Sequence, residues 1–495
     1  MYAAPDNDRD RIDGLATFAA AAFLTGMGLV AALARVGAPD RLVEALGPLI
    51  ALVGLTIIGT LTRTARLGDF LAARRAIPAA YAGLAFAATA GGLILAQQTG
   101  GSPEAALPAM EIALGLAIAA LIFGPLVRSA SASGVADVLA TRFPWARWPY
   151  AIVLWSAGLL TAVAGLEAAV DLVVVHVGQN RRAAEILVAF ALAMSVAPGG
   201  LKGLLWSDAA SAGGALAIAA IGAALAWLGV GGALPFPATG WIAPPEAPAD
   251  AAGFLYDAAS VLGVGVFFAF APPAIGVQSG RAPRAGLYGL AFCVLGFGLG
   301  AVCLAAFPRE TSGAARSATS AALIGAATFL PTLALARAGV LGASRGLGVD
   351  LATAYARLSI LASARIARTR LMMLAVVALA AYATDARIVD PARAIVVALA
   401  VNLAFVTPGL ILAAVSRFRS PAAFASLAAA LATLVRLGVG RSTPPRELLV
   451  AALVAGAVSL IAGFAVGALA SWRFEAQRRT ARADPFSDLP FETRD

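Results

Sequence analysis

The stretch that decides the fold reads Asp69-Phe70-Leu71-Ala72-Ala73-Arg74-Arg75-Ala76-Ile77-Pro78, and the apolar run Ala79-Ala80-Tyr81-Ala82-Gly83-Leu84-Ala85 follows it directly. A basic connector that ends in proline therefore leads into a helix, expected over residues 79–98. The middle of that helix carries only small side chains, Ala87-Ala88-Thr89-Ala90-Gly91-Gly92. Small residues allow another backbone or a ligand to come close. The stretch thus predicts a helix that packs closely on whatever faces it.

The composition around this helix is that of a membrane protein. Hydrophobic residues make up 60% of the chain, charged residues 13%, and the mean hydropathy is +0.86, whereas a soluble domain is about 45–50% apolar and about 25% charged. Apolar runs of roughly 20 residues recur, each long enough to cross a bilayer as a helix. A barrel would show short alternating strands instead. We expect about fourteen membrane helices, near residues 14–34, 45–62, 79–98, 109–127, 150–176, 183–197, 203–229, 253–271, 285–307, 318–345, 366–384, 392–416, 420–438 and 446–472.

The charges between the helices predict the orientation. The side that holds both termini carries about twice as many Lys and Arg residues as the opposite side, which places both termini in the cytoplasm. The net charge of +9 is therefore a topology signal, and no nucleic-acid partner is expected. Two cysteines and one histidine give no metal motif. We expect a multi-pass protein of a bacterial inner membrane, with the lipid bilayer as its partner and no prediction of its oligomeric state.

Three further stretches complete a family pattern. They are Leu126-Val127-Arg128 with Val135-Ala136-Asp137-Val138-Leu139-Ala140-Thr141-Arg142-Phe143, then Gly199-Gly200-Leu201-Lys202-Gly203-Leu204-Leu205-Trp206-Ser207-Asp208, and Leu341-Gly342-Ala343-Ser344 with Asp350-Leu351. With the opening stretch they resemble, in order and spacing, the sodium/solute symporter family, and the acetate/monocarboxylate branch fits best. The resemblance spans roughly residues 45–472 and diverges at the cation site.

The resemblance implies an all-α polytopic membrane protein with a LeuT-type 5+5 inverted repeat. The expected parts are extra helices and a connector (1–78), a first five-helix repeat (79–229), a second repeat (253–416), two extra helices (420–472) and a cytoplasmic tail (473–495). The first helix of each repeat should be interrupted. Phe270-Ala271-Pro272-Pro273 agrees, because two prolines remove two backbone donors; the alternative is that Pro272 and Pro273 simply end a helix near the cytoplasm.

A sodium site needs hard oxygen ligands, and few are present. On the first core helix only Thr89 offers a side-chain oxygen, and on the eighth only Thr332, where Pro331 could also free a carbonyl one turn earlier. Arg337 lies five residues beyond Thr332 in an apolar helix, where a charge is costly unless paired or hydrated. One hypothesis is that its guanidinium replaces the bound cation; the alternative is that its side chain reaches cytoplasmic water.

Two carboxylates are candidates for coupling. Glu167 and Asp171 share one helix face, and burial or a like-charged neighbour could keep one of them protonated. The alternative is that Asp171 lies at the interface while Glu167 pairs with an arginine. Gln97, Gln98 and Asp208 are more simply solvated helix ends. Gly91 and Gly92 are candidates to line a substrate cavity, expected between helices 79–98, 150–176, 253–271 and 318–345.

These observations predict a secondary active transporter and not an enzyme, because no catalytic or nucleotide-binding motif is present. Its substrate would be a small organic solute, with a short monocarboxylate as the choice that the resemblance favours. The protein would move this solute by alternating access, with Na⁺ as the coupling ion that the family resemblance implies and no other cofactor. Two alternatives remain: a sodium-independent or proton-coupled carrier that uses Arg337 or Glu167, and a degenerate, non-transporting sensor or assembly protein.

Overall fold

The computed structural model describes residues 21–23, 25–73, 77–99, 109–123, 135–227, 251–270, 282–305, 318–345, 362–415, 418–440 and 442–482. Pro272 and Pro273 lie outside these ranges, and α11 is described as far as Phe270 without that side chain. The expected interruption of this helix therefore stays a prediction.

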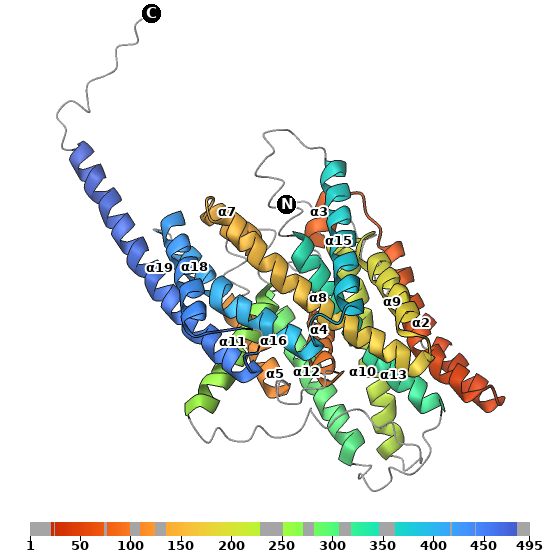
Figure 1. The fold of residues 1–495 in the computed structure, drawn as a ribbon. Helices are drawn as coiled ribbons and strands as arrows, with labels where there is room; N and C mark the ends of the chain where they lie inside the picture. Colours follow the sequence, from red (N-terminus) through yellow and green to blue (C-terminus); the bar gives the residue numbers. More distant parts are fainter. Residues whose placement is uncertain are drawn as a thin grey trace, which may run out of the picture.

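The described part of the chain is helical and contains no strand (Figure 1). After a first helix at residues 21–35, the elements are α2 (Asp40–Leu61), α3 (Leu67–Ala72), α4 (Ala79–Thr99), α5 (Ala109–Ile118), η3 (Ala119–Phe123), α7 (Val135–Arg142), α8 (Arg147–Val177), α9 (Arg181–Val196), α10 (Gly200–Trp227), α11 (Ala251–Phe270), α12 (Ala282–Ala305), α13 (Ala318–Arg345), α15 (Ala362–Asp385), α16 (Pro391–Val401), η8 (Asn402–Val406), α17 (Thr407–Ala414), α18 (Ser420–Arg436) and α19 (Pro445–Arg482). Each of the fourteen expected membrane segments overlaps one of these helices.

Eight of the described helices are long and apolar enough to cross a membrane: α2, α4, α8, α10, α13, α15, the continuous α16–η8–α17, and α19. Shorter apolar helices cover residues 21–35, 110–122, 253–268 and 420–436. The prediction of a multi-pass, all-helical membrane protein is confirmed. In the helix expected at 392–416, one π-helical turn at Asn402–Val406 separates two α-helical parts.

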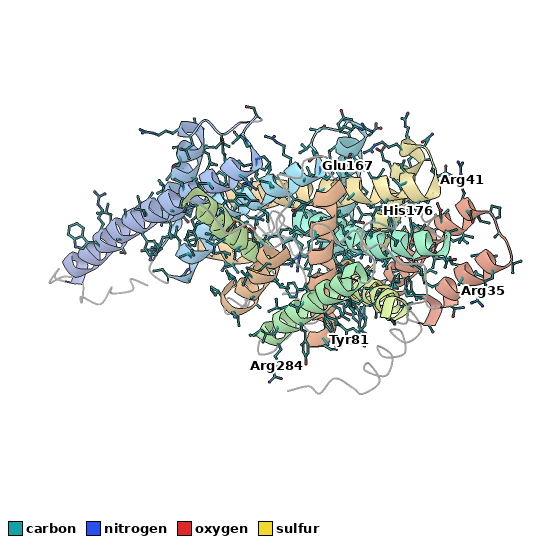
Figure 2. All side chains as sticks on the ribbon, turned by 90° about the horizontal axis from the view of Figure 1, so that it is seen from below. Arg35, Arg41, Tyr81, Glu167, His176 and Arg284 are labelled. Carbon is teal, nitrogen blue, oxygen red and sulfur yellow. The ribbon has the colours of Figure 1, made fainter. Side chains whose placement is uncertain are left out.

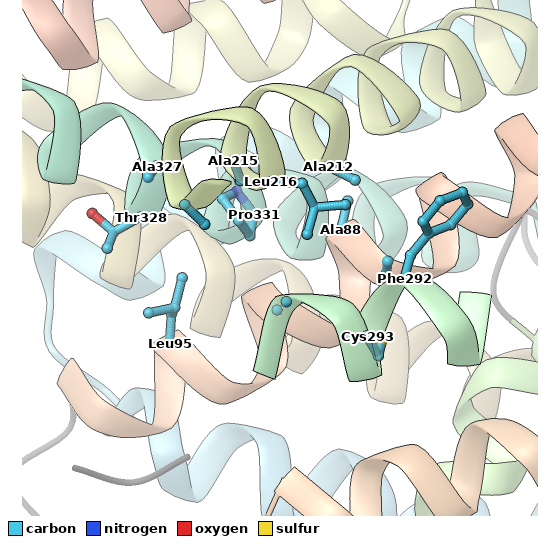
Figure 3. Close-up of a pocket in the computed structure, with 14 residues that line it drawn as sticks. Ala88, Leu95, Ala212, Ala215, Leu216, Phe292, Cys293, Ala327, Thr328 and Pro331 are labelled. Atoms are coloured by element: carbon cyan, nitrogen blue, oxygen red, sulfur yellow. The ribbon is translucent and has the colours of Figure 1, made fainter. Parts of the chain in front are cut away.

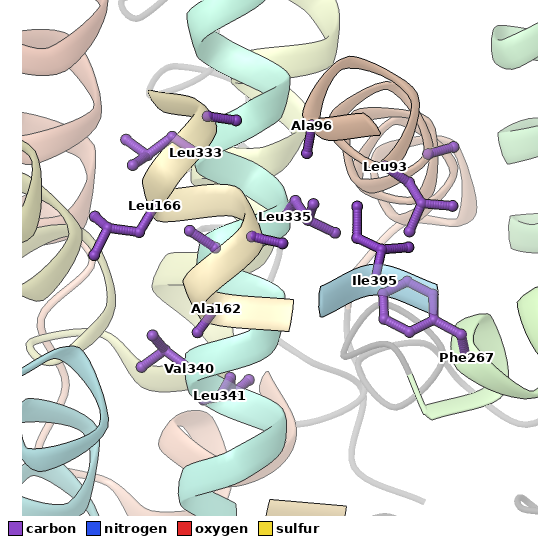
Figure 4. Close-up of a cluster of buried hydrophobic side chains, with 14 of the residues drawn as sticks. Leu93, Ala96, Ala162, Leu166, Phe267, Leu333, Leu335, Val340, Leu341 and Ile395 are labelled. Carbon is purple, nitrogen blue, oxygen red and sulfur yellow. The ribbon is translucent and has the colours of Figure 1, made fainter. Parts of the chain in front are cut away.

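Helix α13 forms the centre of the molecule. In its apolar window, 94% of the residues are buried, and it packs against α8, α2, α4 and α10. The contact with α8 consists of small residues: a Cβ added at Gly158 or Gly165 would meet the backbone of Ala343 or Ala336 within 2.5 Å. Two helices can approach this closely only without bulky side chains. Leu166 from α8 and Leu333 and Leu341 from α13 surround this seam (Figure 4).

The connector and the double glycine of the sequence pattern lie against each other. Gly200 has a φ of +58°, and a Cβ there would meet the carbonyl oxygen of Phe70 at 2.6 Å. Arg370 from α15 covers this junction: its guanidinium donates to the carbonyl oxygens of Thr64 (2.9 Å) and Pro198 (2.8 Å). It also lies 5.4 Å from the centre of the Phe70 ring. Stretches 130 residues apart in the sequence thus form one packing unit with the start of α15.

Two pairs of helices flank the central ones, on opposite sides of the molecule (Figure 1). On one side, α2 and the helix at residues 21–35 cover α13 through Val30, Val43 and Ala322. On the other side, α18 and α19 pack on each other and against α16 and α17. The central helices are therefore enclosed along both flanks.

Candidate functional site

The two predicted cation-ligating threonines are buried, and each hydroxyl is already bonded within its own helix. Thr89 and Thr332 are both 0% exposed. Thr89 Oγ1 donates to the carbonyl oxygen of Ala85 at 3.1 Å, and Thr332 Oγ1 donates to that of Phe329 at 2.8 Å. Side-chain bonds of this type are common for Thr inside helices. Each hydroxyl oxygen can still accept a hydrogen bond, but the two hydroxyls do not bond to each other.

Helices α4 and α13 meet at the glycine pair, with backbone against backbone. A Cβ built on Gly92 would lie 2.2 Å from the carbonyl oxygen of Pro331, and one on Gly91 would lie 3.3 Å from the Pro331 side chain. The small-residue centre of α4 therefore lies against Pro331, and Gly92 is filled by protein rather than open to a cavity. The prediction that Gly92 lines a cavity is not what the structure shows.

Arg337 is entirely buried and forms an ion pair with the neighbouring helix α10. The side chains of Arg337 and Asp208 are both 0% exposed. Arg337 Nε and Nη2 each lie 2.7 Å from Asp208 Oδ1, and Nη2 also donates to Ser211 Oγ at 2.8 Å. The interpretation in which Arg337 reaches cytoplasmic water is therefore wrong. So is the interpretation of Asp208 as a solvated helix end, because that carboxylate is the counter-ion of a charge buried between α10 and α13.

The same pair leaves polar atoms unused. Within the described part of the chain, Arg337 Nη1, Asp208 Oδ2 and Ser207 Oγ are buried without a hydrogen-bond partner. A buried polar atom without a partner is costly. The buried pair therefore keeps one unused donor and one unused acceptor, although its charge is compensated.

A small pocket lies between α4, α10, α12 and α13 (Figure 3). Ala88, Gly91 and Leu95 of α4, Ala212 and Leu216 of α10, Phe292 and Cys293 of α12, and Ala327, Thr328 and Pro331 of α13 are among its lining residues. No charged side chain is among the described residues that line it. Because Pro331 has no N–H, the carbonyl of Ala327 one turn earlier lacks its helical donor. Thr328 is the polar side chain of the described lining, and its hydroxyl donates to the carbonyl oxygen of Ile324 at 2.8 Å, so that it can act toward a ligand as an acceptor.

This pocket differs from the expected cavity. Helices α4 and α13 line it as predicted, but α10 and α12 take the places expected for α8 and α11. The reason is the small-residue seam between α8 and α13, where Gly339 of α13 lies against Ala162 of α8. Helices in backbone contact leave no room for a cavity between them. Gln97, expected at a solvated end of α4, is also buried, at 2% exposure.

The two carboxylates of α8 are held by one arginine of α9. Arg181 lies 2.5 Å from Glu167, 2.6 Å from Asp171 and 3.4 Å from Glu185. Glu167 and the nearby His176 are labelled on this part of α8 in Figure 2, whereas the exposed Arg35 and Arg41 lie on the rim. Glu167 therefore pairs with an arginine and Asp171 is partly exposed, as the simpler of the two interpretations expected.

Two buried polar groups were missed by the sequence reasoning. Glu111 in α5 is 5% exposed and accepts a hydrogen bond from Ser260 of α11. Asn402, at the start of the π-helical turn, is 3% exposed, and its Oδ1 has no partner in the described part of the chain. A single polar residue in a long apolar run was the available signal for both, because such residues are rare inside membranes and are functional candidates by default.

Comparison with solved structures finds 35 matching chains. One of them is a Na⁺-coupled sialic acid symporter in a substrate-bound, outward-open state, a structure described as revealing a novel Na⁺ site. The match covers 87% of this chain and 98% of the symporter, with a TM-score of 0.64 and 15% sequence identity. No protein-family model and no curated protein matches the sequence. At this identity the likeness establishes a shared helical fold over nearly the whole symporter.

Proposed function

We propose that this chain is a secondary active transporter that moves a small organic solute across the membrane by alternating access. The observation that carries the proposal is the fold: the helices of a Na⁺-coupled symporter are present along 98% of that protein's length. The order of motifs in the sequence supports it independently, because those motifs meet in space at Phe70 and Gly200. Membership of the sodium/solute symporter family belongs to the same proposal.

The packing pattern supports two inverted repeats, 79–229 and 253–416, between extra helices at 1–78 and 420–472. If α4, α5, α8, α9 and α10 correspond to α11, α12, α13, α15 and α16, some contacts should recur with the repeats exchanged. The contact of α4 with α12 is matched by that of α11 with α5, and α10 with α13 by α16 with α8. The contact of α8 with α9 is likewise matched by that of α13 with α15. Such pairs are expected of inverted-repeat transporters.

We propose the pocket between α4, α10, α12 and α13 as part of the solute path. Ligand sites are commonly apolar hollows with a few oriented polar groups, and here those groups are the Ala327 carbonyl and Thr328. A small solute with a substantial apolar part fits this lining. A short monocarboxylate remains the choice that the resemblance favours, within an inner membrane with both termini in the cytoplasm.

The test is uptake into proteoliposomes that contain the purified chain, with a panel of labelled short monocarboxylates and other small organic solutes. Each solute is offered with an inward Na⁺ gradient, an inward proton gradient, or neither. We expect at least one solute to accumulate or exchange above protein-free vesicles. Gly296 of α12 also lines the pocket, so Gly296→Phe, which places a large ring there, should abolish that uptake. Gly54→Phe, at a partly exposed position of α2 with no neighbouring atom within 4 Å, should not.

A second candidate is a non-transporting protein that keeps the fold, with a sensing or assembly role. It is favoured by the tight contact of Gly92 with Pro331, which closes the region where cation ligands were expected. If no solute in the panel moves under any gradient, and Gly296→Phe behaves like Gly54→Phe, the transport proposal fails and this second candidate is preferred.

A further inference from the structure

The most unusual group in the described part of the chain is the charge in the middle of α13. Arg337 is the largest of the fully buried side chains, and among the described residues its charged partner within hydrogen-bond distance is Asp208 of α10. A guanidinium does not lose its proton in proteins. Between these two helices the chain therefore holds a permanent positive charge that needs no ion from solution.

The partners of this charge are those that a sodium ion prefers. Asp208 supplies a carboxylate and Ser211 a hydroxyl one turn later in α10. Both are hard oxygen ligands from one helix, and both contact Arg337 of α13. Without Arg337, Asp208 would be an uncompensated buried carboxylate, and such a group either takes up a proton or binds a cation.

With Arg337 in place, a sodium ion does not fit. Arg337 donates a hydrogen bond from Nε to Asp208 Oδ1 and one from Nη2 to Ser211 Oγ, and Nη2 also lies 2.7 Å from Asp208 Oδ1. The guanidinium therefore occupies the space and compensates the charge that would attract the ion. A sodium ion close enough to bind Asp208 would be repelled by the positive charge of Arg337, and the low dielectric of the buried region makes this repulsion strong. The Na⁺ that the fold and the family resemblance imply therefore disagrees with the residues present.

We infer that Arg337 is a built-in cation that takes the place of a bound sodium ion between α10 and α13, so that this chain neither binds Na⁺ at Asp208 nor requires it. Because this cation belongs to a side chain of α13, it links α10 and α13 in every state in which the two helices stay together. The consequence for coupling, sodium-independent transport, rests on the proposed function; the ion-binding statement does not.

The test measures thermal unfolding of the full chain in detergent, without substrate, in NaCl and in choline chloride at equal ionic strength. The wild-type midpoint should differ between the two salts by less than about 1 °C. Arg337→Ser should unfold at a lower temperature in choline chloride and regain part of the loss as Na⁺ is added, with a saturable dependence, because a ligand that binds only the folded state stabilises it by mass action. Arg337→Ser/Asp208→Asn, which lacks both charges, is the matched control and should not respond to Na⁺.

Saturable stabilisation of the wild type by Na⁺ overturns the inference, and so does a folded Arg337→Ser variant that is indifferent to Na⁺. If Arg337→Ser does not fold, Arg337→Lys replaces it: this variant keeps a buried positive charge and should be as insensitive to Na⁺ as the wild type. Sodium-stimulated stability of Arg337→Lys overturns the inference. Because no solute is present in these measurements, they can fail while uptake is found, or succeed while no uptake is found.

Discussion

The contact between α4 and α13 makes a sharp prediction, because two adjacent glycines of one helix meet very different surroundings. An alanine at 92 would place its Cβ 2.2 Å from the carbonyl oxygen of Pro331, whereas an alanine at 91 would place it 3.3 Å from the Pro331 side chain. The first distance is short of normal contact by about 1 Å. The added Cβ would be attached to the backbone of α4, and the oxygen belongs to the backbone of α13. Neither atom is the end of a flexible side chain that could move aside.

Two opposing effects set the magnitude. Replacing Gly by Ala in a helix interior stabilises the helix by about 0.5–1 kcal/mol, and this gain applies to both positions. Overpacking costs about 1–3 kcal/mol, and it applies in full only at Gly92, where α4 must move away from α13. We therefore expect Gly91→Ala to be neutral or slightly stabilising. Gly92→Ala should lose about 1–2 kcal/mol in net free energy of unfolding.

The assay is thermal unfolding of the three proteins in one detergent, with size-exclusion profiles to confirm that each is monodisperse. Gly92→Ala should unfold roughly 1–3 °C below Gly91→Ala, because in a chain of 495 residues 1 kcal/mol shifts the midpoint by about 1 °C. Equal midpoints for the two variants would show that α4 and α13 are not in backbone contact at Pro331. The small residues of α4 would then not serve a close approach of this helix to α13.

Two other predictions concern buried partners. Asp208→Asn or Arg337→Met alone should each lower the free energy of unfolding by about 3–5 kcal/mol, and the double variant by clearly less than their sum, because breaking a buried ion pair leaves one charge uncompensated; additive losses in a thermal or denaturant series would contradict the pairing. Gly200→Ala should lower it by about 1–2 kcal/mol for the left-handed backbone alone, and further because the added Cβ meets Phe70; Gly213→Ala, in the same helix with no atom within 4 Å of its Cβ, is the control and should not be destabilised.

Much of the fold could be predicted from the sequence because its signals are local. Apolar runs long enough to span a bilayer gave the positions of the helices, and the order of short motifs gave their arrangement. The contact between Phe70 and Gly200 shows why those motifs work: a left-handed glycine admits the aromatic residue of a distant connector. Each motif contains the residues on one side of such a contact, so each motif can be recognised in the sequence without its partner.

The candidate site was harder to predict because the role of each charged residue depends on which residue it pairs with. Arg337 was a candidate from its position in an apolar helix, but Asp208, 129 residues away, was interpreted as a solvated end. Glu167 was a coupling candidate from its position, and only the structure shows that it pairs with Arg181. The charge of a residue is a local property, whereas its free energy depends on which group faces it, and nothing in the spacing of a single helix gives that.

The sequence by itself determined that this is a polytopic helical membrane protein with small residues at the centre of its first core helix, since hydropathy, length and side-chain size act within one segment. Only the tertiary structure decided that those small residues contact Pro331, that α10 and α12 line the pocket, and that Arg337 pairs with Asp208. The physical reason is that these facts depend on how each helix is rotated about its axis. Rotating a helix about its axis by about 100°, the angle between consecutive residues, brings a different side chain to face the same neighbour.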